Sequence, residues 1–203
     1  LNKSLYDAYI KSFRWSTDRL TNDNGGIIAF VTNGAWLDGN STDGFRKVIE
    51  EEFSAIYVFN LRGNARTSGE TRRKEAGNVF KEGSRTPISI TLLIKISDHI
   101  GKAEIYYHDI GDYLNREEKL KIISDFKSIN QIPFKQLKPN KEGDWINQRN
   151  QNFQNFNCIN PQKKFDDKSL SFFKVNGPGI LSSRDNWVYN YDSITLKENM
   201  KSM

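Results

Sequence analysis

The stretch AIYVFNLRGNARTSGETRRKEAGNVFKEGSRTPISITLLIKI, from Ala55 to Ile96, decides the fold expected for this chain. Both ends of the stretch are apolar runs rich in Ile, Val, Tyr and Phe, a composition typical of buried strands. Its middle is polar, basic and contains several glycines, which predicts a long loop. Loops of this length inside a compact domain are uncommon and are usually functional or disordered. The stretch therefore predicts two strands joined by a functional loop, with a solvated, partly disordered loop as the alternative.

The predicted loop carries most of the net charge of the chain. From Arg62 to Arg85, seven Lys or Arg residues stand against three Glu residues, which gives +4 where the whole chain has +5. A basic loop held between two rigid strands is suited to binding phosphate groups. The candidate phosphate contacts are Arg62, Arg66, Arg72, Arg73, Lys74 and Arg85. For each of them the alternative is an exposed charge without a partner.

The residues before this stretch predict a helix, a strand and a second helix. Apolar residues at helical spacing predict a helix from Leu5 to Leu20, and the run GIIAFVT from Gly26 to Thr32 suits a parallel strand covered on both faces. A helix that ends near Phe53 follows, with Ser41 or Thr42 as its cap. Because no helix separates the two strands of the central stretch, we expect those two strands to be antiparallel.

Regular structure is expected to end near residue 130. Lys102 to Asp109 predicts an edge strand, and Asn115 to Ile129 predicts a helix in which Asn115 and Glu118 have the spacing of a capping box. Between Trp145 and Gln162, 10 of 18 residues are Asn or Gln. This part is interpreted as a solvated connector, with a nucleic-acid contact surface as the alternative.

Composition excludes several classes of protein. No run of about 18 apolar residues exists, and the N-terminus is polar, so neither a membrane span nor a signal peptide is expected. The single Cys158 cannot form an internal disulfide, and with His99 and His108 it does not complete a usual zinc set. These features predict a cytoplasmic protein without a metal site. The first residue is Leu1, which indicates a fragment of a longer protein.

Several ordered segments resemble a known family. IAFVTNGAWLDGNSTDGFRK, IYVFNLRGNARTSGE, RRKEAGNVF, GSRTPISITLLIK, HDIGDYL, REEKL, DWINQRN and SRDNWVYNY resemble the adenine-specific DNA methyltransferase region of type ISP and related type II single-polypeptide restriction-modification enzymes. The resemblance implies an α/β fold: the back half of the mixed sheet of a Rossmann-like methyltransferase, with the last strand antiparallel, followed by a largely irregular segment. It divides the chain into residues 1–130, the back half of the catalytic domain, and residues 131–203, a connector towards the DNA target-recognition region.

The same resemblance implies that part of the enzyme is missing from this sequence. Such enzymes have a glycine-rich motif for S-adenosylmethionine and an Asn-Pro-Pro-Tyr or Asp-Pro-Pro-Tyr tetrapeptide, and the sequence contains neither. We therefore expect no catalytic residue in this chain, no binding of S-adenosylmethionine by the chain alone, and an upstream half of the methyltransferase domain as its partner. The implied reaction is methyl transfer to the exocyclic amine of adenine in double-stranded DNA.

The resemblance also implies roles for individual residues. An enzyme that modifies adenine must extrude the base and stack it on an aromatic side chain, and Phe80 stands at the matching place before the last strand. A core phenylalanine is the alternative. Asn33 and Trp36 follow the first strand at its carboxyl end and are expected at the pocket edge, where ligands bind in open α/β sheets, although Trp36 is equally suited to packing. His108 and Asp109 are interpreted as structural residues.

Two other functions remain open from the sequence. One is a non-catalytic DNA-binding module that has inherited the methyltransferase fold and uses the basic loop and the amide-rich tail. The other is a different Rossmann-like enzyme that acts on a small molecule, which a lack of DNA affinity would favour.

Overall fold

The computed structural model describes residues 3–21, 23–80, 83–160, 171–173 and 185–202. The chain divides into two compact units, Leu1–Arg149 and Asn150–Met203. The first unit contains the sheet, both apolar cores and every residue singled out above for a functional role except those of the amide-rich tail.

The described residues of the first unit form one five-stranded sheet, four α-helices and several short 3-10 helices. Its regular elements are η1 Lys3–Tyr6, α1 Ala8–Thr17, β1 Gly26–Asn33, η2 Gly34–Trp36, η3 Asn40–Thr42, α2 Asp43–Glu52, β2 Ala55–Arg62, α3 Gly69–Glu75, β3 Ile88–Lys95, β4 Glu104–Asp109, α4 Arg116–Phe126, η4 Ile129–Gln131 and β5 Lys135–Leu137.

The sheet is mixed, with strand order β1-β3-β2-β4-β5. Strand β3 lies between β1 and β2 and is antiparallel to both, so β1 and β2 run in the same direction. Strand β4 is parallel to β2, and β5 is antiparallel to β4. The α/β class and the antiparallel last strand of the predicted fold are therefore confirmed. The carboxyl ends of β1, β2 and β4 meet at one edge of the sheet.

One face of the sheet packs against α1 and α2. Phe13 of α1, Ile49 of α2 and Leu93 of β3 are almost fully buried there. Rings of Phe13, Phe30, Phe45, Trp36 and Trp145 contact one another edge to face, with centroids 5.0 to 5.8 Å apart. Burial of these aromatic side chains is the main source of stability for this half of the unit.

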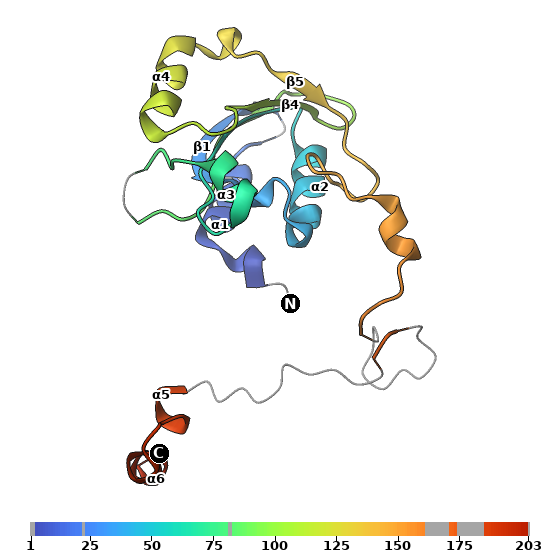
Figure 1. The fold of residues 1–203 in the computed structure, drawn as a ribbon. Coiled ribbons are helices and arrows are strands. Elements are labelled where there is room, and N and C mark those ends of the chain that lie inside the picture. The colour runs from blue at the N-terminus through green and yellow to red at the C-terminus, as the bar shows by residue number, and fades with distance from the viewer. Residues whose placement is uncertain (1–2, 22, 81–82, 161–170, 174–184, 203) are drawn as a thin grey trace. The chain divides into compact units, whose positions relative to one another are not determined.

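Helix α4 covers part of the opposite face. Figure 1 shows α4 on the other side of the sheet from α1 and α2. Ile123 and Phe126 of α4 pack on a second core that contains Phe59 and Ile88. The β1 portion of this face has little cover among the described residues, because Ile27 is 65% and Val31 54% exposed.

Two features differ from the sequence-based expectation. Strand β4 is not an edge strand, because β5 pairs with its outer side. The central loop contains a short helix, α3.

In β3 the face of Ser89, Thr91 and Leu93 is more deeply buried than the face of Ile90, Leu92 and Ile94, because α1 and α2 cover the former. Residues 131–149 belong to the first compact unit. The division of the chain into a catalytic half, residues 1–130, and a connector, residues 131–203, stays a prediction.

The second unit has little regular structure in its described residues. It contains η5 Gln151–Asn155, α5 Asp185–Val188, α6 Ser193–Lys201 and an isolated bridge between Cys158 and Ser171. The carboxylate of Asp192 caps α6 by accepting from the backbone N–H groups of Ile194 and Thr195. Among the described residues no helix is long and apolar enough to cross a membrane.

Candidate nucleic-acid interface

The loop between β2 and β3 is closed at its base by backbone and side-chain hydrogen bonds. The Ala65 N–H donates to the Arg85 carbonyl at 3.0 Å. The Asn78 amide donates to the Thr86 carbonyl at 2.8 Å and to the Gly63 carbonyl at 3.2 Å. These contacts define a neck, formed by Gly63, Ala65, Asn78, Arg85 and Thr86, that fixes both ends of the loop to the sheet.

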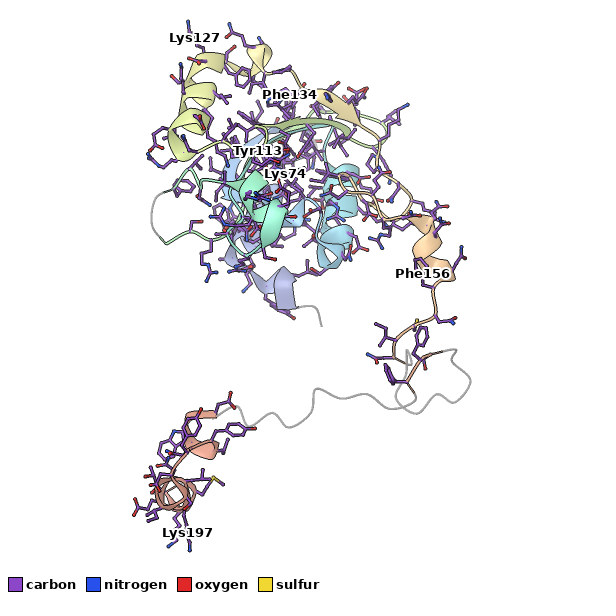
Figure 2. All side chains as sticks on the ribbon, in the orientation of Figure 1. Lys74, Tyr113, Lys127, Phe134, Phe156 and Lys197 are labelled. Carbon is purple, nitrogen blue, oxygen red and sulfur yellow. The ribbon has the colours of Figure 1, made fainter. Side chains whose placement is uncertain are left out.

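The loop is also attached to α4 and the turn before it. The Gly77 N–H donates to the Leu114 carbonyl, and the Tyr113 N–H donates to the Lys74 carbonyl at 2.9 Å. Tyr113 and Lys74 accordingly lie next to each other in Figure 2. The ammonium of Lys119, a fully buried side chain of α4, donates to the carbonyls of Leu61, Glu75 and Gly77 at 2.9, 2.9 and 2.7 Å.

The neighbours Val79 and Phe80 point in opposite senses with respect to the core. Val79 is 8% exposed and belongs to the second core, whereas Phe80 is 53% exposed. The Phe80 N–H donates to the side-chain oxygen of Asn78, which fixes the backbone at this point. Phe80 is therefore not a core residue in this structure, and its side chain is accessible to a planar ligand. Stacking on a base stays a prediction.

The six basic residues predicted to contact phosphate fall into two groups. Arg62 bonds Asp109 at 2.7 Å and also pairs with Asp112, while Arg73 pairs with Glu70, and Lys74 lies 3.7 Å from Asp112. The Arg72 guanidinium donates to the Ala76 carbonyl at the end of α3. Contact of these four residues with phosphate stays a prediction, and it would require the side chains to exchange or share their present partners.

Arg66 and Arg85 form the second group. Both side chains are exposed, and within the described residues neither makes an ion pair. The Arg66 backbone is held by Asn64, and the Arg85 carbonyl belongs to the neck. Two exposed cations that form no ion pair within the described residues are the best candidates for phosphate contacts in the loop.

A cavity of about 390 Å³ lies at the edge where the carboxyl ends of β1, β2 and β4 meet. Its wall includes Asn60, Arg62, Tyr107 and Asp109, which form one hydrogen-bonded network. The Tyr107 hydroxyl donates to Asp109 at 2.9 Å and accepts from the Asn60 amide at 3.0 Å. Burial raises the pKa of Tyr107 above its usual range, so its hydroxyl stays protonated.

Arg62 has an unusual backbone at this edge. Its φ is +55°, the pairing of β2 with β3 shifts register between Asn60 and Arg62, and Gly63 follows with a φ of +90°. Burial lowers the pKa of Arg62, but Asp109 and Asp112 more than offset this effect, so the net shift is upward. The guanidinium is therefore a fixed positive charge in the cavity wall that pairs with Asp109, also in the wall, and with Asp112.

The two residues predicted for the pocket edge occupy different places. Asn33 is the N-cap of η2, where its side chain accepts from the Ala35 N–H at 2.9 Å. Trp36 has no exposed surface and packs against Phe13, Phe45 and Trp145. Trp36 thus lies in the core instead of at the pocket edge, because η2 turns the chain back over the sheet. The cavity wall at this point is formed by Gly34, Ala35 and Leu37.

The structural interpretation of His108 agrees with its surroundings. The imidazole contacts the rings of Phe59, Phe126 and Phe134, and its Nδ1 lies 3.2 Å from the Pro133 carbonyl oxygen. Among the described residues no group of three His, Cys, Asp or Glu side chains is arranged to hold a metal ion.

Sequence reasoning missed Asn60 and Tyr107 as members of a polar site. Asn60 is a polar residue within the largely apolar β2, and Tyr107 lies near the carboxyl end of β4 among aromatic and polar residues. Their places in these strands could have indicated the site only once β2 and β4 were known to be parallel neighbours. The predicted antiparallel pairing of β2 with β3 did not indicate that β2 also pairs with β4.

The chain is similar to several proteins of solved structure. No protein-family model matches the chain, and no curated protein matches it. A nuclease-deletion mutant of the type ISP restriction-modification enzyme LlaGI in complex with a DNA substrate mimic is 43% identical over 99% of the chain, with a TM-score of 0.83. The ATP-dependent type ISP restriction-modification enzyme LlaBIII bound to DNA is 38% identical over 100% of the chain, with a TM-score of 0.88.

A DrdV–DNA complex is 31% identical over 98% of the chain, with a TM-score of 0.83. The chain covers only 18%, 13% and 19% of the lengths of these three proteins. It is therefore similar, along almost its whole length, to one region of much larger proteins whose structures contain DNA.

Proposed function

We propose that this chain is the back half of an adenine-specific DNA methyltransferase region within a restriction-modification enzyme. Identity of 43% and 38% to two type ISP restriction-modification enzymes supports this setting. The antiparallel β3 between β1 and β2 supports the methyltransferase region, since this arrangement is what the sequence resemblance implied. The assigned reaction transfers a methyl group from S-adenosylmethionine to the exocyclic amine of adenine in double-stranded DNA, in the cytoplasm.

The single observation that carries the proposal is the placement of Phe80. It stands on the loop between β2 and β3, 53% exposed, while its neighbour Val79 is anchored in the core. Extruded bases are held by stacking on aromatic faces. In the proposed enzyme Phe80 stacks on the extruded adenine, and Arg66 and Arg85 bind the phosphates beside it.

The methyl donor is assigned to the whole enzyme and not to this chain. The polar side chains Asn60, Arg62, Tyr107 and Asp109 in the cavity wall already bond one another, so they do not form a free set of ligands for S-adenosylmethionine. The expected glycine-rich motif and catalytic tetrapeptide are absent from the sequence. We propose that the preceding part of the same protein supplies both, and no step of the reaction is assigned to a cofactor site here.

The test is to replace Phe80 in the full-length protein that contains this chain. Phe80→Ala should lower methyl transfer and the fluorescence of 2-aminopurine at the target position, because a stacked base is worth about 1–3 kcal/mol. Phe80→Trp should retain much of both, since it also offers a π-face. Phe172→Ala removes another exposed phenylalanine, outside the loop, and should change neither signal. Equal turnover and fluorescence in Phe80→Ala would exclude the stacking role.

A non-catalytic DNA-binding module is the second candidate, and the exposed guanidinium groups of Arg66 and Arg85, which form no ion pair within the described residues, favour it. Replacing both by Ala should lower affinity for all DNA sequences alike and flatten the salt dependence by about one unit per lost contact. This result together with an unchanged Phe80→Ala variant would favour the binding module. A full-length protein without DNA affinity would instead favour an enzyme acting on a small molecule.

A further inference from the structure

We infer that Lys119 is a positioning residue that holds the Phe80 segment in place by binding three backbone carbonyls. This inference rests on the proposed function, because it assigns to Lys119 the support of the base-stacking side chain. The three acceptors come from different parts of the chain: Leu61 near the end of β2, Glu75 at the end of α3, and Gly77 just before Asn78, Val79 and Phe80. One ammonium thus joins the sheet, the loop helix and the start of the Phe80 segment.

The chemistry of the contact explains why a lysine stands here. An ammonium group has three N–H donors, one for each of the three carbonyls. Without the ammonium, each carbonyl would lose this hydrogen-bond partner. Lys119 is completely buried, and among the described residues no carboxylate makes an ion pair with it. A methylene chain without the ammonium would fill the same space but remove this donor from one buried and two partly buried carbonyls.

Neighbouring contacts act on the same segment. The Arg116 guanidinium, one turn earlier in α4, donates to the Val79 carbonyl at 3.0 Å. Gly77 approaches α4 so closely that a Cβ on it would stand 2.6 Å from the Arg116 backbone nitrogen. The first turn of α4 therefore fixes residues 75–79, while the Phe80 ring beyond them stays exposed.

The first part of the experiment measures amide hydrogen exchange in the full chain. Lys119→Met should speed the exchange of the Ala76, Gly77 and Phe80 amides by about tenfold or more, because the carbonyl contacts that restrain them are lost. Strand β3 should keep its protection. Lys121→Met, the same change on an exposed lysine of the same helix, is the matched control. Unchanged exchange of the three amides in Lys119→Met would overturn the inference.

The second part uses the full-length protein and 2-aminopurine fluorescence. Lys119→Met should lower the fluorescence signal of base extrusion while DNA affinity at low salt stays near that of the wild type, a split that a purely structural role would not give. Faster hydrogen exchange of the loop amides together with unchanged base extrusion would support the positioning role of Lys119 and exclude the stacking role of Phe80. If Lys119→Met does not fold, Lys119→Gln decides: its amide group has only two N–H donors for three carbonyls, so exchange of the Gly77 and Phe80 amides should still speed up, and no change there would overturn the inference.

Discussion

Arg46 is a buried charged side chain that joins backbone segments distant in the sequence. It has no exposed surface, and its guanidinium donates to the carbonyls of Gly143, Trp36 and Gly39 at 2.7, 2.7 and 3.0 Å. The carboxylate of Asp144 lies 3.4 Å away. Burial lowers the pKa of Arg46, but a guanidinium keeps its proton at any pH at which the protein folds. These bonds hold residues 143–144 against α2.

Asp144 should make stability depend on acid pH. Hydrogen bonds from Arg149, at 2.7 Å to each carboxylate oxygen, together with one from Asn140, hold the pKa of Asp144 far below its usual range. A carboxyl group with a lowered folded-state pKa stabilises the protein above its unfolded-state pKa of about 3.9, and this stability is lost as pH falls below that value. Asp144→Asn should therefore unfold more easily near pH 7, by about 3 kcal/mol.

The measurement is urea unfolding from pH 7 to pH 2. In Asp144→Asn the difference from the wild type should shrink as the pH falls below about 4. Asp125→Asn, an exposed aspartate of α4, serves as the control and should stay within about 0.5 kcal/mol of the wild type. A constant difference across the whole range would show that packing, and not the charge of Asp144, is responsible.

Single residues were the hardest features to predict from the sequence. A lysine in a helix usually lies on the exposed face. No residue near Lys119 in the sequence indicates that the carbonyls of Leu61, Glu75 and Gly77 surround its ammonium group. Trp145 stands at the start of an amide-rich tail, yet it is 2% exposed and its indole N–H donates to Glu50 at 2.6 Å. Both depend on contacts between residues far apart in the chain, which composition and periodicity do not report.

At the scale of elements, the sequence was more informative. The capping box of α4 was predicted from Asn115 and Glu118 and is present, with reciprocal bonds of 2.9 and 2.7 Å. Strands β1, β2 and β3 lie where their apolar runs predicted them. Thr42 does precede α2, but its hydroxyl donates to the carbonyls of Trp36 and Gly39 instead of capping the helix. Short elements such as α3 and β5 were missed, because their stability comes from neighbours and not from their own pattern.

The contact of the loop with α4 should tolerate no side chain at Gly77. Gly77→Ala would place a Cβ against the backbone of Arg116 and Asn115, at 2.6 and 3.0 Å, so loop and helix must separate. We expect a loss of about 1–3 kcal/mol in the free energy of unfolding. The control is Gly44→Ala in the first turn of α2, where nothing lies within 4 Å of the new Cβ. That change should stabilise the protein by up to about 1 kcal/mol.

Thermal unfolding followed by circular dichroism compares the two glycine variants. The expected result is a lower melting temperature for Gly77→Ala and an equal or higher one for Gly44→Ala. Similar melting temperatures for both would mean that α4 can move away from the loop without cost, which would also weaken the case for a fixed Phe80 segment.

At the scale of the whole molecule, the main feature is the outer edge of β1, which pairs with no strand among the described residues. Among the described residues β1 pairs with β3 alone, and its Ile27 and Val31 are 65% and 54% exposed. A strand with apolar residues on both faces and an unpaired edge is a template for further pairing. We propose that, in the whole enzyme, the upstream half of the methyltransferase domain covers this region and continues the sheet.

The chain by itself should therefore associate through β1. Replacing Ile27 and Val31 together by Lys should reduce self-association in sedimentation velocity with little change in the free energy of unfolding, because both side chains are already largely exposed. The same double variant should lose the capacity to bind a co-expressed upstream segment. Ile100→Lys, at a 95% exposed position, is the control. Undiminished association of the double variant would place the contact elsewhere.

The neck of the central loop separates the loop tip, where insertions should cost little stability, from the sheet. Because Ala65 and Arg85 are already joined, lengthening the loop beyond Gly83 adds only the entropy of a slightly larger ring, about 0.6 kcal/mol for each doubling of its length. The sheet below would not be altered. A new loop tip could therefore be grafted at this point while the five strands keep their register.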